Sequence, residues 1–382
     1  MKHFLTLILL ASLATQCSSP TPQEGSLLDQ NIELAVTQYK GMQKQLGEGE
    51  FPRSYENSSF TTSSSEWWCS GFYPGTLLYL YEETEDSSLL QEAHRMLTLL
   101  EKEQYNTSTH DLGFMMYCSF GNANRLNPQA AYTNILINSA RSLATRFSPV
   151  TGCIRSWDSK PEDFIVIIDN MMNLELLFWA TKATGDSSFY NIAVTHANTT
   201  LENHFRSDNS SYHVLNYDST GAVKQKKTAQ GLHDESAWAR GQAWGLYGYT
   251  ATYRETKDEK YLEQAVKIAG FILSHPNLPE DKIPLWDFDA EKDALRDASA
   301  AAIMASALIE LDTYAPDKGY LKVAEEILTN LTSDYTAEPG TNGQFIITHC
   351  VGHLPANSEV DVPLTYADYY FMEALMRLEY GL

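Results

Sequence analysis

Polar turns alternate with apolar helical stretches along this chain in a recurring pattern. Four segments place an aspartate seven residues before an alanine, at Asp86, Asp186, Asp258 and Asp317. An aspartate in this position accepts hydrogen bonds from the free backbone N–H groups of a helix start, and the apolar residues that follow recur at helical spacing. Each segment therefore predicts the end of one helix, a short turn and the start of the next helix, which together form a repeated helical hairpin.

The stretches between these turns are apolar on more than one face. They begin at Gly71, Asn170, Ala239 and Ser299 and read GFYPGTLLYLYEET, NMMNLELLFWATKAT, ARGQAWGLYGYTATYRET and SAAAIMASALIELDTY. A helix that is apolar all round is buried on most of its sides. We therefore expect an inner ring of helices that is covered by an outer ring.

The number of predicted hairpins approaches six. The gap between Asp86 and Asp186 holds a further helical stretch, AYTNILINSARSLATRF, and the chain ends on another, YADYYFMEALMRLEY. We predict an all-α fold, an (α/α)6 barrel that forms a closed toroid of six hairpins, in one domain over residues 31–382. An open helical solenoid is the structural alternative.

The size and charge of the chain narrow its class of function. Its 382 residues are 43% hydrophobic, which is enough for a sizeable core. The formal net charge of −22 disfavours nucleic acid or an anionic membrane surface as a partner, because phosphate binding needs a basic surface. One dense basic run, KQKK at Lys224–Lys227, predicts either a solvated loop or a local receptor for sulfate or carboxylate groups.

The N-terminus is typical of an export signal. Lys2 and His3 precede an apolar run over residues 4–14. This run is too short to span a bilayer, but it fits the core of a signal peptide. We therefore expect an exported protein.

Cys17 follows the apolar run and precedes the polar stretch SSPTPQEGS. We predict a lipoprotein-type signal peptide over residues 1–16, lipidation of Cys17 and a flexible tether over residues 17–30. The protein would then reside in the periplasm or at the outer membrane, and it would contact the membrane only through its lipid anchor. Cleavage after Ala14 without lipidation is the alternative.

Candidate chemistry concentrates in three stretches that are rich in glycine and aromatic residues. They read SEWWCSGFYPG, HDLGFMMYCSFG and TAQGLHDESAWARGQAWGLYG. All three come where loops that join hairpins pass into inner helices, and such loops line the cleft at one end of a toroid. We therefore expect the functional residues of the chain in these stretches.

Asp169 lies between an apolar run and a helical pattern, in IVIIDNMMNLELLFWA. An aspartate before a helix commonly caps it, and hydrogen bonds to the helix N–H groups then lower its pKa. A proton donor instead needs a raised pKa, which apolar neighbours such as Ile168 and Met171 or a second carboxylate such as Asp111 would provide. Both interpretations are open from the residues alone.

Asp111 and Arg240 also have two interpretations each. Asp111, in THDLG, is either part of a simple polar turn or a carboxylate of the cleft. Arg240, in WARGQAW, either pairs with a structural acid such as Glu235 or Asp234 or uses its planar guanidinium group to capture a carboxylate beside Trp244.

Aromatic and histidine residues complete the candidate set. Trp68 precedes a glycine turn rather than lying within an apolar helix, and aromatic faces at cleft rims stack on sugars. His213 lies in SSYHVLNYD, which fits a surface turn or a ligand contact equally well. The HDE run at His233–Glu235 lacks a partner pair at ligand spacing, so it does not indicate a metal site.

Together these motifs resemble the unsaturated glucuronyl hydrolases of glycoside hydrolase family 88. The resemblance rests on WWCSGFYPGTLLYLYEET, HDLGFMMYCSFG, IIDNMMNLELLFWA, TAQGLHDESAWARGQAWGLYG, PLWDFDA with LRDASAAAIMASALIEL, and YADYYFMEALMRL. These motifs run in order over nearly the whole chain that follows the predicted signal peptide. Members of the family use an (α/α)6 barrel, and the resemblance implies neither a metal nor an organic cofactor.

The resemblance implies a substrate with a C4=C5 double bond in a terminal uronic acid. An acid protonates C4, water adds at C5, and the resulting hemiketal opens to release the neighbouring sugar. One carboxyl group that acts first as acid and then as base is sufficient for this reaction, whereas ordinary glycosidases need two. Asp169 matches the acid/base of the family and Asp111 its second catalytic carboxylate.

The resemblance also implies a set of substrate-binding residues. These are Trp68, His213, Gln230, Arg240 and Trp244. Arg240 would offset the charge of the uronate, and the partner would be an unsaturated uronic-acid oligosaccharide derived from a glycosaminoglycan. Two alternatives remain: an unsaturated rhamnogalacturonyl hydrolase that acts on pectin fragments, and a non-catalytic glycan-binding lipoprotein that keeps the aromatic platforms without a working acid.

Overall fold

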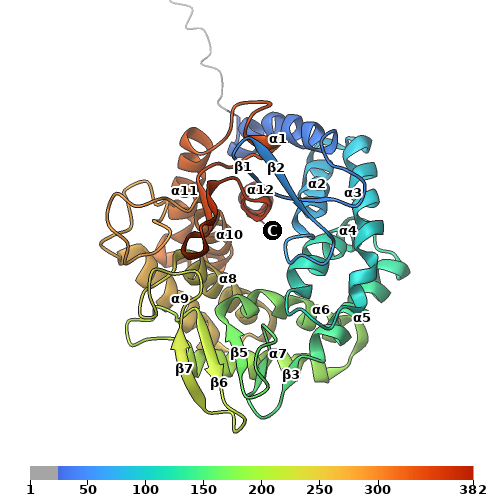
Figure 1. The fold of residues 1–382 in the computed structure, drawn as a ribbon. Helices are drawn as coiled ribbons and strands as arrows, with labels where there is room; N and C mark the ends of the chain where they lie inside the picture. Colours follow the sequence, from blue (N-terminus) through green and yellow to red (C-terminus); the bar gives the residue numbers. More distant parts are fainter. Residues whose placement is uncertain (1–24, 382) are drawn as a thin grey trace, which may run out of the picture.

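The structure, a computed structural model, describes residues 25–381. Figure 1 shows its helices arranged in a ring, with the N-terminal elements beside the C-terminal helix. Twelve α-helices lie within the described residues. They are α1 Leu27–Gln43, α2 Phe72–Thr84, α3 Ser87–Leu100, α4 Asn122–Leu126, α5 Ala130–Ala144, α6 Leu174–Thr184, α7 Ser187–Asn203, α8 Ala239–Thr256, α9 Glu259–Ser274, α10 Ala298–Tyr314, α11 Tyr320–Asp334 and α12 Thr365–Tyr380.

The even-numbered helices form the inner ring and the odd-numbered helices cover it. Helix α4 continues a π-helix, Gly113–Gly121, and the two together fill one inner position. Helix α12 packs against α10 on one side and against α2 on the other. This contact closes the ring, so the predicted (α/α)6 barrel is confirmed over the open solenoid.

The burial of the two kinds of helix follows from their sequences. In the inner helix α10 every residue from Ala298 to Leu311 is buried, and most of these side chains are small. Small side chains let a helix pack closely on several sides at once. The outer helix α3 instead buries a stripe with helical spacing, which includes Leu89, Ala93 and Met96.

Three of the four predicted aspartate caps are confirmed. Asp86, Asp186 and Asp258 each accept a hydrogen bond from the backbone N–H two residues further on, at the starts of α3, α7 and α9. The prediction for Asp317 is wrong. Asp317 lies inside a 3₁₀ turn, and α11 begins after Gly319, whose φ of 74° places it in the left-handed region that a glycine adopts without strain.

The stretch HDLGFMMYCSFG, which we placed where a hairpin-joining loop passes into an inner helix, enters the inner ring as the π-helix and α4. The first outer helix, α1, begins at Leu27 and so includes the last residues of the predicted tether over residues 17–30. The predicted signal peptide and Cys17 lie outside the described residues.

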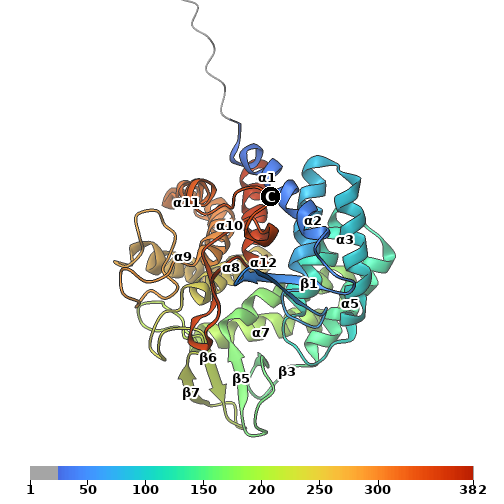
Figure 2. The same ribbon diagram turned by 45° about the horizontal axis from the view of Figure 1, so that its top comes forward.

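Nine short antiparallel strands lie around the barrel in the described part of the chain. They are β1 Phe51–Glu56, β2 Ser59–Ser63, β3 Phe147–Ser148, β4 Cys153–Ile154, β5 Phe164–Ile167, β6 Val214–Tyr217, β7 Val223–Lys227, β8 Cys350–His353 and β9 Ser358–Val362. Strands β5, β6 and β7 form one sheet that projects from the ring of helices, as Figures 1 and 2 show. The apolar run before Asp169 is strand β5. Within residues 25–381, no helix combines the length and apolar character needed to cross a membrane.

Candidate active site

A cavity of about 100 Å³ lies where the N-terminal ends of the inner helices converge. Its lining includes Trp68 just before α2, Asp169 just before α6, and Arg240 and Trp244 in the first turns of α8. The remaining lining residues are His110, Asp111, Phe114, Trp157, Ile167, Gln230 and Trp238. The closed ring thus brings together residues that lie far apart in the sequence.

The carboxyl group of Asp169 is buried at this cavity, with 8% of the residue exposed. Asp169 is the second residue of a 3₁₀ turn, Ile168–Asn173, whose start has no side-chain cap. Its Oδ2 atom has no hydrogen-bond partner among the described residues. The capping interpretation is therefore wrong, and Asp169 is free for chemistry.

The surroundings of Asp169 favour its protonated form. The pKa of Asp169 is raised to about 7, because the effect of burial, with a smaller contribution in the same direction from the charge of Asp111, outweighs the lowering by the Arg240 guanidinium group. A carboxyl group whose pKa lies near neutrality exists in both protonation states at the pH of most cells. It can therefore both give and take a proton.

Asp111 and Asp169 are held by one hydrogen-bond network around Ser156. The Ser156 hydroxyl donates to Asn170 Oδ1 over 2.7 Å and accepts from the backbone N–H of Ile167 over 2.9 Å, on either side of Asp169. The Ser156 carbonyl accepts a hydrogen bond from His110 Nδ1 over 3.0 Å, beside Asp111. One residue therefore fixes the segments that carry both carboxylates.

A close approach of two backbones brings these segments together. The Phe114 N–H donates to Asn173 Oδ1 over 3.1 Å. A Cβ atom at Gly113 would lie 2.4 Å from Asn173 Cα, which is too close for any side chain. Only glycine fits at this point, so the π-helix and the turn of Asp169 can pack directly against each other.

Asp111 itself lies in the turn before the π-helix. Its Oδ2 accepts a hydrogen bond from the Thr109 hydroxyl over 3.1 Å, and its Oδ1 lies 3.2 Å from His110 Nε2. Both interpretations of Asp111 therefore hold, because it is a turn residue whose carboxylate also lines the cavity.

Arg240 is fully buried and its donors have partners within the protein. Its Nη1 atom donates to Asp297 Oδ2 over 3.1 Å and to the Val351 carbonyl, and its Nη2 atom donates to the Gly352 carbonyl over 2.7 Å. The structural acid is therefore Asp297, the N-cap residue of α10, and not Glu235 or Asp234. Arg240 fixes strand β8 beside the cavity, and its binding of a substrate carboxylate stays a prediction.

Gln230 and His213 form the adjoining wall. Gln230 Nε2 donates to the same Gly352 carbonyl over 2.9 Å. His213 Nδ1 accepts from the backbone N–H groups of Ala229 and Gln230, at 3.2 and 3.3 Å. His213 stacks on Trp238, with ring centroids 4.4 Å apart, and it is not one of the lining residues.

His213 therefore lies behind the wall of the cavity and holds the Gln230 loop in place. Burial keeps the pKa of His213 well below its usual value, and the charge of Arg240 lowers it further. The ring is thus neutral, and the proton is assigned to Nε2 because Nδ1 accepts two N–H groups. Six of the seven predicted site residues line the cavity, and His213 supports it from behind.

Aromatic rings make up much of the remaining wall. Trp68 contacts Phe114 and Tyr366, with ring centroids 5.5 and 4.9 Å apart. Trp244 contacts Phe114 at 5.1 Å. Trp157 is 39% exposed, which is unusual for a tryptophan and typical of a binding surface.

Sequence reasoning did not select five of the lining residues. His110, Phe114 and Trp238 lie inside motifs that we had singled out. Their closeness in sequence to predicted site residues could have identified them. Ile167 lies in the motif IIDNMMNLELLFWA, directly before the turn of Asp169. Trp157 had no such signal. It reaches the cavity because the segment before it lies beside strand β5, where the Ser156 N–H donates to the Ile165 carbonyl over 2.8 Å.

The basic run KQKK is neither a loop nor part of the cavity. It forms most of strand β7, where Lys224 pairs with Asp163 over 2.7 Å and Lys226 lies over the Tyr212 ring. Within residues 25–381, no group of histidine, cysteine and acidic side chains has the arrangement of a metal site. Cys69, Cys118, Cys153 and Cys350 are free thiols.

A buried acid of near-neutral pKa beside tryptophan faces, at one end of an (α/α)6 barrel, is the arrangement of a carbohydrate-cleaving enzyme. The model of Glycosyl Hydrolase Family 88 matches residues 45–382. The chain belongs to this family.

Individual relatives agree with this assignment. An unsaturated glucuronyl hydrolase from Formosa agariphila is 46% identical over 98% of this chain and 97% of its own length. An unsaturated chondroitin disaccharide hydrolase from Streptococcus pneumoniae is 32% identical over 85% of each chain. A solved structure of an unsaturated glucuronyl hydrolase specific for heparin has a TM-score of 0.90 and 50% identity, covering 92% of this chain and 96% of that chain.

We expect Asp169→Asn to stabilise the protein at about pH 8 by roughly 2–4 kcal/mol. The pKa of Asp169 is about 7 in the folded state and lies near 3.8 in an unperturbed aspartate. Between these values the folded state holds a proton that the unfolded state has lost, so wild-type stability falls as the pH rises through this window. Asparagine does not ionise, and it avoids this loss. Urea unfolding at about pH 4 and pH 8 measures the difference in the free energy of unfolding between the variant and wild type. This difference should nearly vanish at the lower pH.

Asp163→Asn is the matched control for this measurement. The hydrogen bond from Lys224 lowers the pKa of Asp163, so its ionised form stabilises the folded state at neutral pH and the gain is lost in acid. Asp163→Asn should therefore be less stable than wild type at about pH 8, the opposite sign. If Asp169→Asn changed the free energy of unfolding by the same amount at both pH values, that result would contradict a raised pKa for Asp169.

Proposed function

We propose that this chain removes the terminal 4,5-unsaturated uronic acid from glycosaminoglycan oligosaccharides that polysaccharide lyases release. Two features support the proposal: membership of Glycosyl Hydrolase Family 88 and the activities for which the relatives of the chain are named. The observation that carries it is the buried, unpartnered carboxyl group of Asp169, whose pKa is about 7.

The chemistry needs one group that changes its protonation state twice. Asp169, in its protonated form, gives its proton to C4 of the enol ether while water adds at C5. The resulting carboxylate takes the proton of that water, so Asp169 returns to its starting state. The hemiketal formed at C5 then opens to a ketone, which leaves a hemiacetal at C1. That hemiacetal collapses to an aldehyde, and the neighbouring sugar leaves with the proton of the hemiacetal hydroxyl. A pKa near neutrality suits both transfers, because neither proton transfer is then strongly uphill.

The neighbouring residues have separate roles in this proposal. Asp111 raises the pKa of Asp169 and accepts hydrogen bonds from sugar hydroxyl groups. Arg240 keeps that pKa from rising further and supplies positive potential for the uronate, while it holds strand β8 in place. Trp68 and Trp244 provide apolar faces for the sugar ring.

The activities for which the relatives are named favour glycosaminoglycan fragments over pectin fragments. One solved structure is that of an enzyme specific for heparin, and one curated relative acts on unsaturated chondroitin disaccharides. No feature of the cavity favours the rhamnogalacturonyl alternative. A non-catalytic glycan-binding protein is disfavoured, because it would not need a buried acid of raised pKa.

We expect Asp169→Asn to lower turnover by at least about 10²-fold, since the amide cannot donate an acidic proton. The assay follows loss of the ultraviolet absorbance of the conjugated double bond. Its substrates are lyase-generated disaccharides from heparin, chondroitin, hyaluronan and pectin, and wild type should act on at least one of the glycosaminoglycan products.

Asp317→Asn is the control, because Asp317 is an exposed carboxylate on the outside of the barrel. It should retain wild-type turnover. Residual turnover by Asp169→Asn within a few-fold of wild type would remove Asp169 from the catalytic role. Action of wild type on the pectin product alone would support the rhamnogalacturonyl alternative instead.

We propose further that the protein is exported and carries a lipid on Cys17. The support is the sequence alone: a short apolar run after Lys2, then a cysteine, then a polar stretch. A lipid anchor would hold the barrel at a membrane surface without any membrane-spanning helix.

Cys17→Ala should move the protein from the membrane pellet to the soluble fraction of a bacterial host that processes lipoproteins. The loss of the thiol removes the site of lipid attachment. Ser18→Ala, at the next position, should leave the protein in the pellet. Equal partitioning of wild type and Cys17→Ala would contradict lipidation at this residue.

A further inference from the structure

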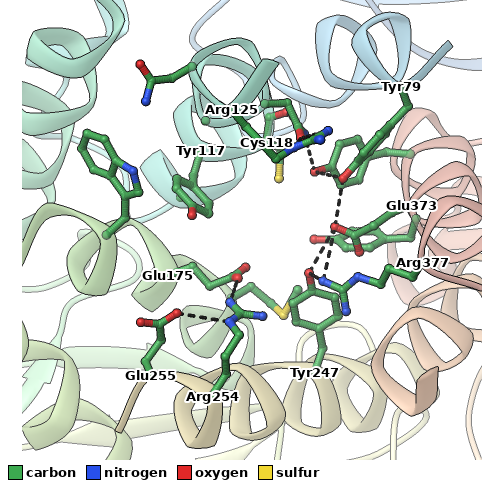
Figure 3. A pocket seen from close by; sticks show the side chains of 18 residues that line it. Tyr79, Tyr117, Cys118, Arg125, Glu175, Tyr247, Arg254, Glu255, Glu373 and Arg377 are labelled. Atoms are coloured by element: carbon green, nitrogen blue, oxygen red, sulfur yellow. Dashed lines mark hydrogen bonds and ion pairs between the residues drawn. The ribbon is translucent and has the colours of Figure 1, made fainter. Parts of the chain in front are cut away.

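A second and larger cavity lies in the barrel, near the C-terminal ends of the inner helices. Its volume is about 410 Å³, which is within the range of small-molecule sites. Figure 3 shows the side chains that surround it, which come from several inner helices. The exposed fractions of the Arg254 and Arg125 side chains, 29% and 39%, show that the cavity opens to solvent.

This cavity is separate from the candidate active site. Arg240 and Arg254 lie on the same helix, α8, and line different cavities. They are 14 positions apart, or about 21 Å along the helix axis. The rings of Trp244 and Tyr370 contact each other at 5.4 Å, and each lines a different cavity. Aromatic packing therefore divides the interior of the barrel in two.

The charges that line this cavity are balanced. Three carboxylates, Glu175, Glu255 and Glu373, face three guanidinium groups. Arg254 pairs with Glu175 and with Glu255, and Arg377 lies 3.7 Å from Glu373. The third guanidinium group, that of Arg125, pairs with Glu82 outside the lining, and Glu255 pairs with Lys182, which is also outside it. Each charged group of the lining therefore has a partner of opposite sign among the described residues, so the walls suit a neutral occupant.

The same pairs hold their polar atoms in fixed positions. Glu373 accepts hydrogen bonds from the hydroxyl groups of Tyr79 and Tyr247, over 3.3 and 3.2 Å. Arg254 and Arg377 both donate to Glu310 behind the wall, over 2.8 and 3.0 Å. A network of this kind presents rigid donors and acceptors, which cost little entropy to use when a ligand binds.

Aromatic faces with free polar edges lie among these groups. Tyr117 and Trp179 both line the cavity and are only partly buried. Among the described residues, neither the Tyr117 hydroxyl nor the Trp179 indole N–H has a hydrogen-bond partner. An apolar face with a free polar edge binds a ligand that has both C–H faces and hydroxyl groups.

We propose that this cavity is a second carbohydrate site, which binds a neutral mono- or disaccharide away from the catalytic carboxyl group. Sugar hydroxyl groups would bind the fixed carboxylate and guanidinium edges, and a pyranose face would pack on Trp179 and Tyr117. The unsaturated uronates are anionic and do not match a charge-balanced cavity. The inference does not depend on the activity at Asp169.

The test is binding of neutral sugars to the full-length protein by calorimetry and by saturation-transfer NMR. The probes are galactose, N-acetylglucosamine, N-acetylgalactosamine and lactose. Wild type should bind at least one of them with a dissociation constant in the millimolar range or tighter. Trp179→Ala should weaken that binding at least about tenfold, through loss of the stacking face and its contact area.

Three further variants make the result decisive. Tyr117→Phe removes a single hydroxyl group and should weaken binding about fivefold, in line with one hydrogen bond. It replaces Trp179→Ala as the test if circular dichroism shows that Trp179→Ala does not fold. Trp68→Ala, at the other end of the barrel, and Tyr105→Ala, an exposed position, should leave the binding unchanged.

Two outcomes would overturn the proposal. The first is no binding of any of these sugars by wild type. The second is binding that Trp68→Ala abolishes while Trp179→Ala and Tyr117→Phe retain it, because the sugar would then occupy the candidate active site. Neither outcome involves turnover, so a failure of the proposed hydrolase activity would be seen separately in the absorbance assay.

Discussion

A carboxyl group buried without a hydrogen-bond partner is the constraint on which the rest of this structure depends. Asp169 resists ionisation because it is buried and its Oδ2 atom has no hydrogen-bond donor among the described residues. If the surrounding backbone were flexible, such a group would move to reach solvent. The hydrogen bonds of Ser156 to Asn170 and Ile167 prevent this, and the direct packing of Gly113 on Asn173 holds the opposite wall.

The closed ring explains why the two ends of the barrel differ in chemistry. All the inner helices that line the smaller cavity present their N-terminal ends to it, and Arg240 ties α8 to α10 and to β8 there. At this end the carboxyl groups outnumber the guanidinium groups. Asp169 lies near a second carboxylate, Asp111, and the one nearby guanidinium group, that of Arg240, also pairs with Asp297. At the other end the carboxylates and guanidinium groups are paired. One end is therefore suited to proton transfer and the other to binding without reaction.

Much of this could be predicted from the sequence, because periodicity reports burial directly. The aspartate turns and the apolar stretches predicted the alternation of outer and inner helices, and the family motifs predicted six of the residues that line the cavity. The bounds of the inner helix after Gly113 could not be predicted, because a π-helix rich in glycine and aromatic residues has no regular apolar stripe. The prediction of a cap at Asp317 failed because α11 begins after Gly319 instead. Trp157 was not predicted, because only the hydrogen bond of its neighbour Ser156 to strand β5 brings it to the cavity. The pKa of Asp169 depends on three-dimensional burial, which a motif does not contain.

The pH dependence of kcat/KM, followed by loss of double-bond absorbance, tests the central claim most directly. It reports the ionisation of the essential groups of the free enzyme. If Asp169 must be protonated to react, kcat/KM should fall about tenfold per pH unit above a midpoint near its pKa of about 7, and Asp111→Asn should move that midpoint down, because it removes a charge that raises the pKa. A rate that is independent of pH from about 6 to 9 would show that the buried carboxyl group is not the proton donor.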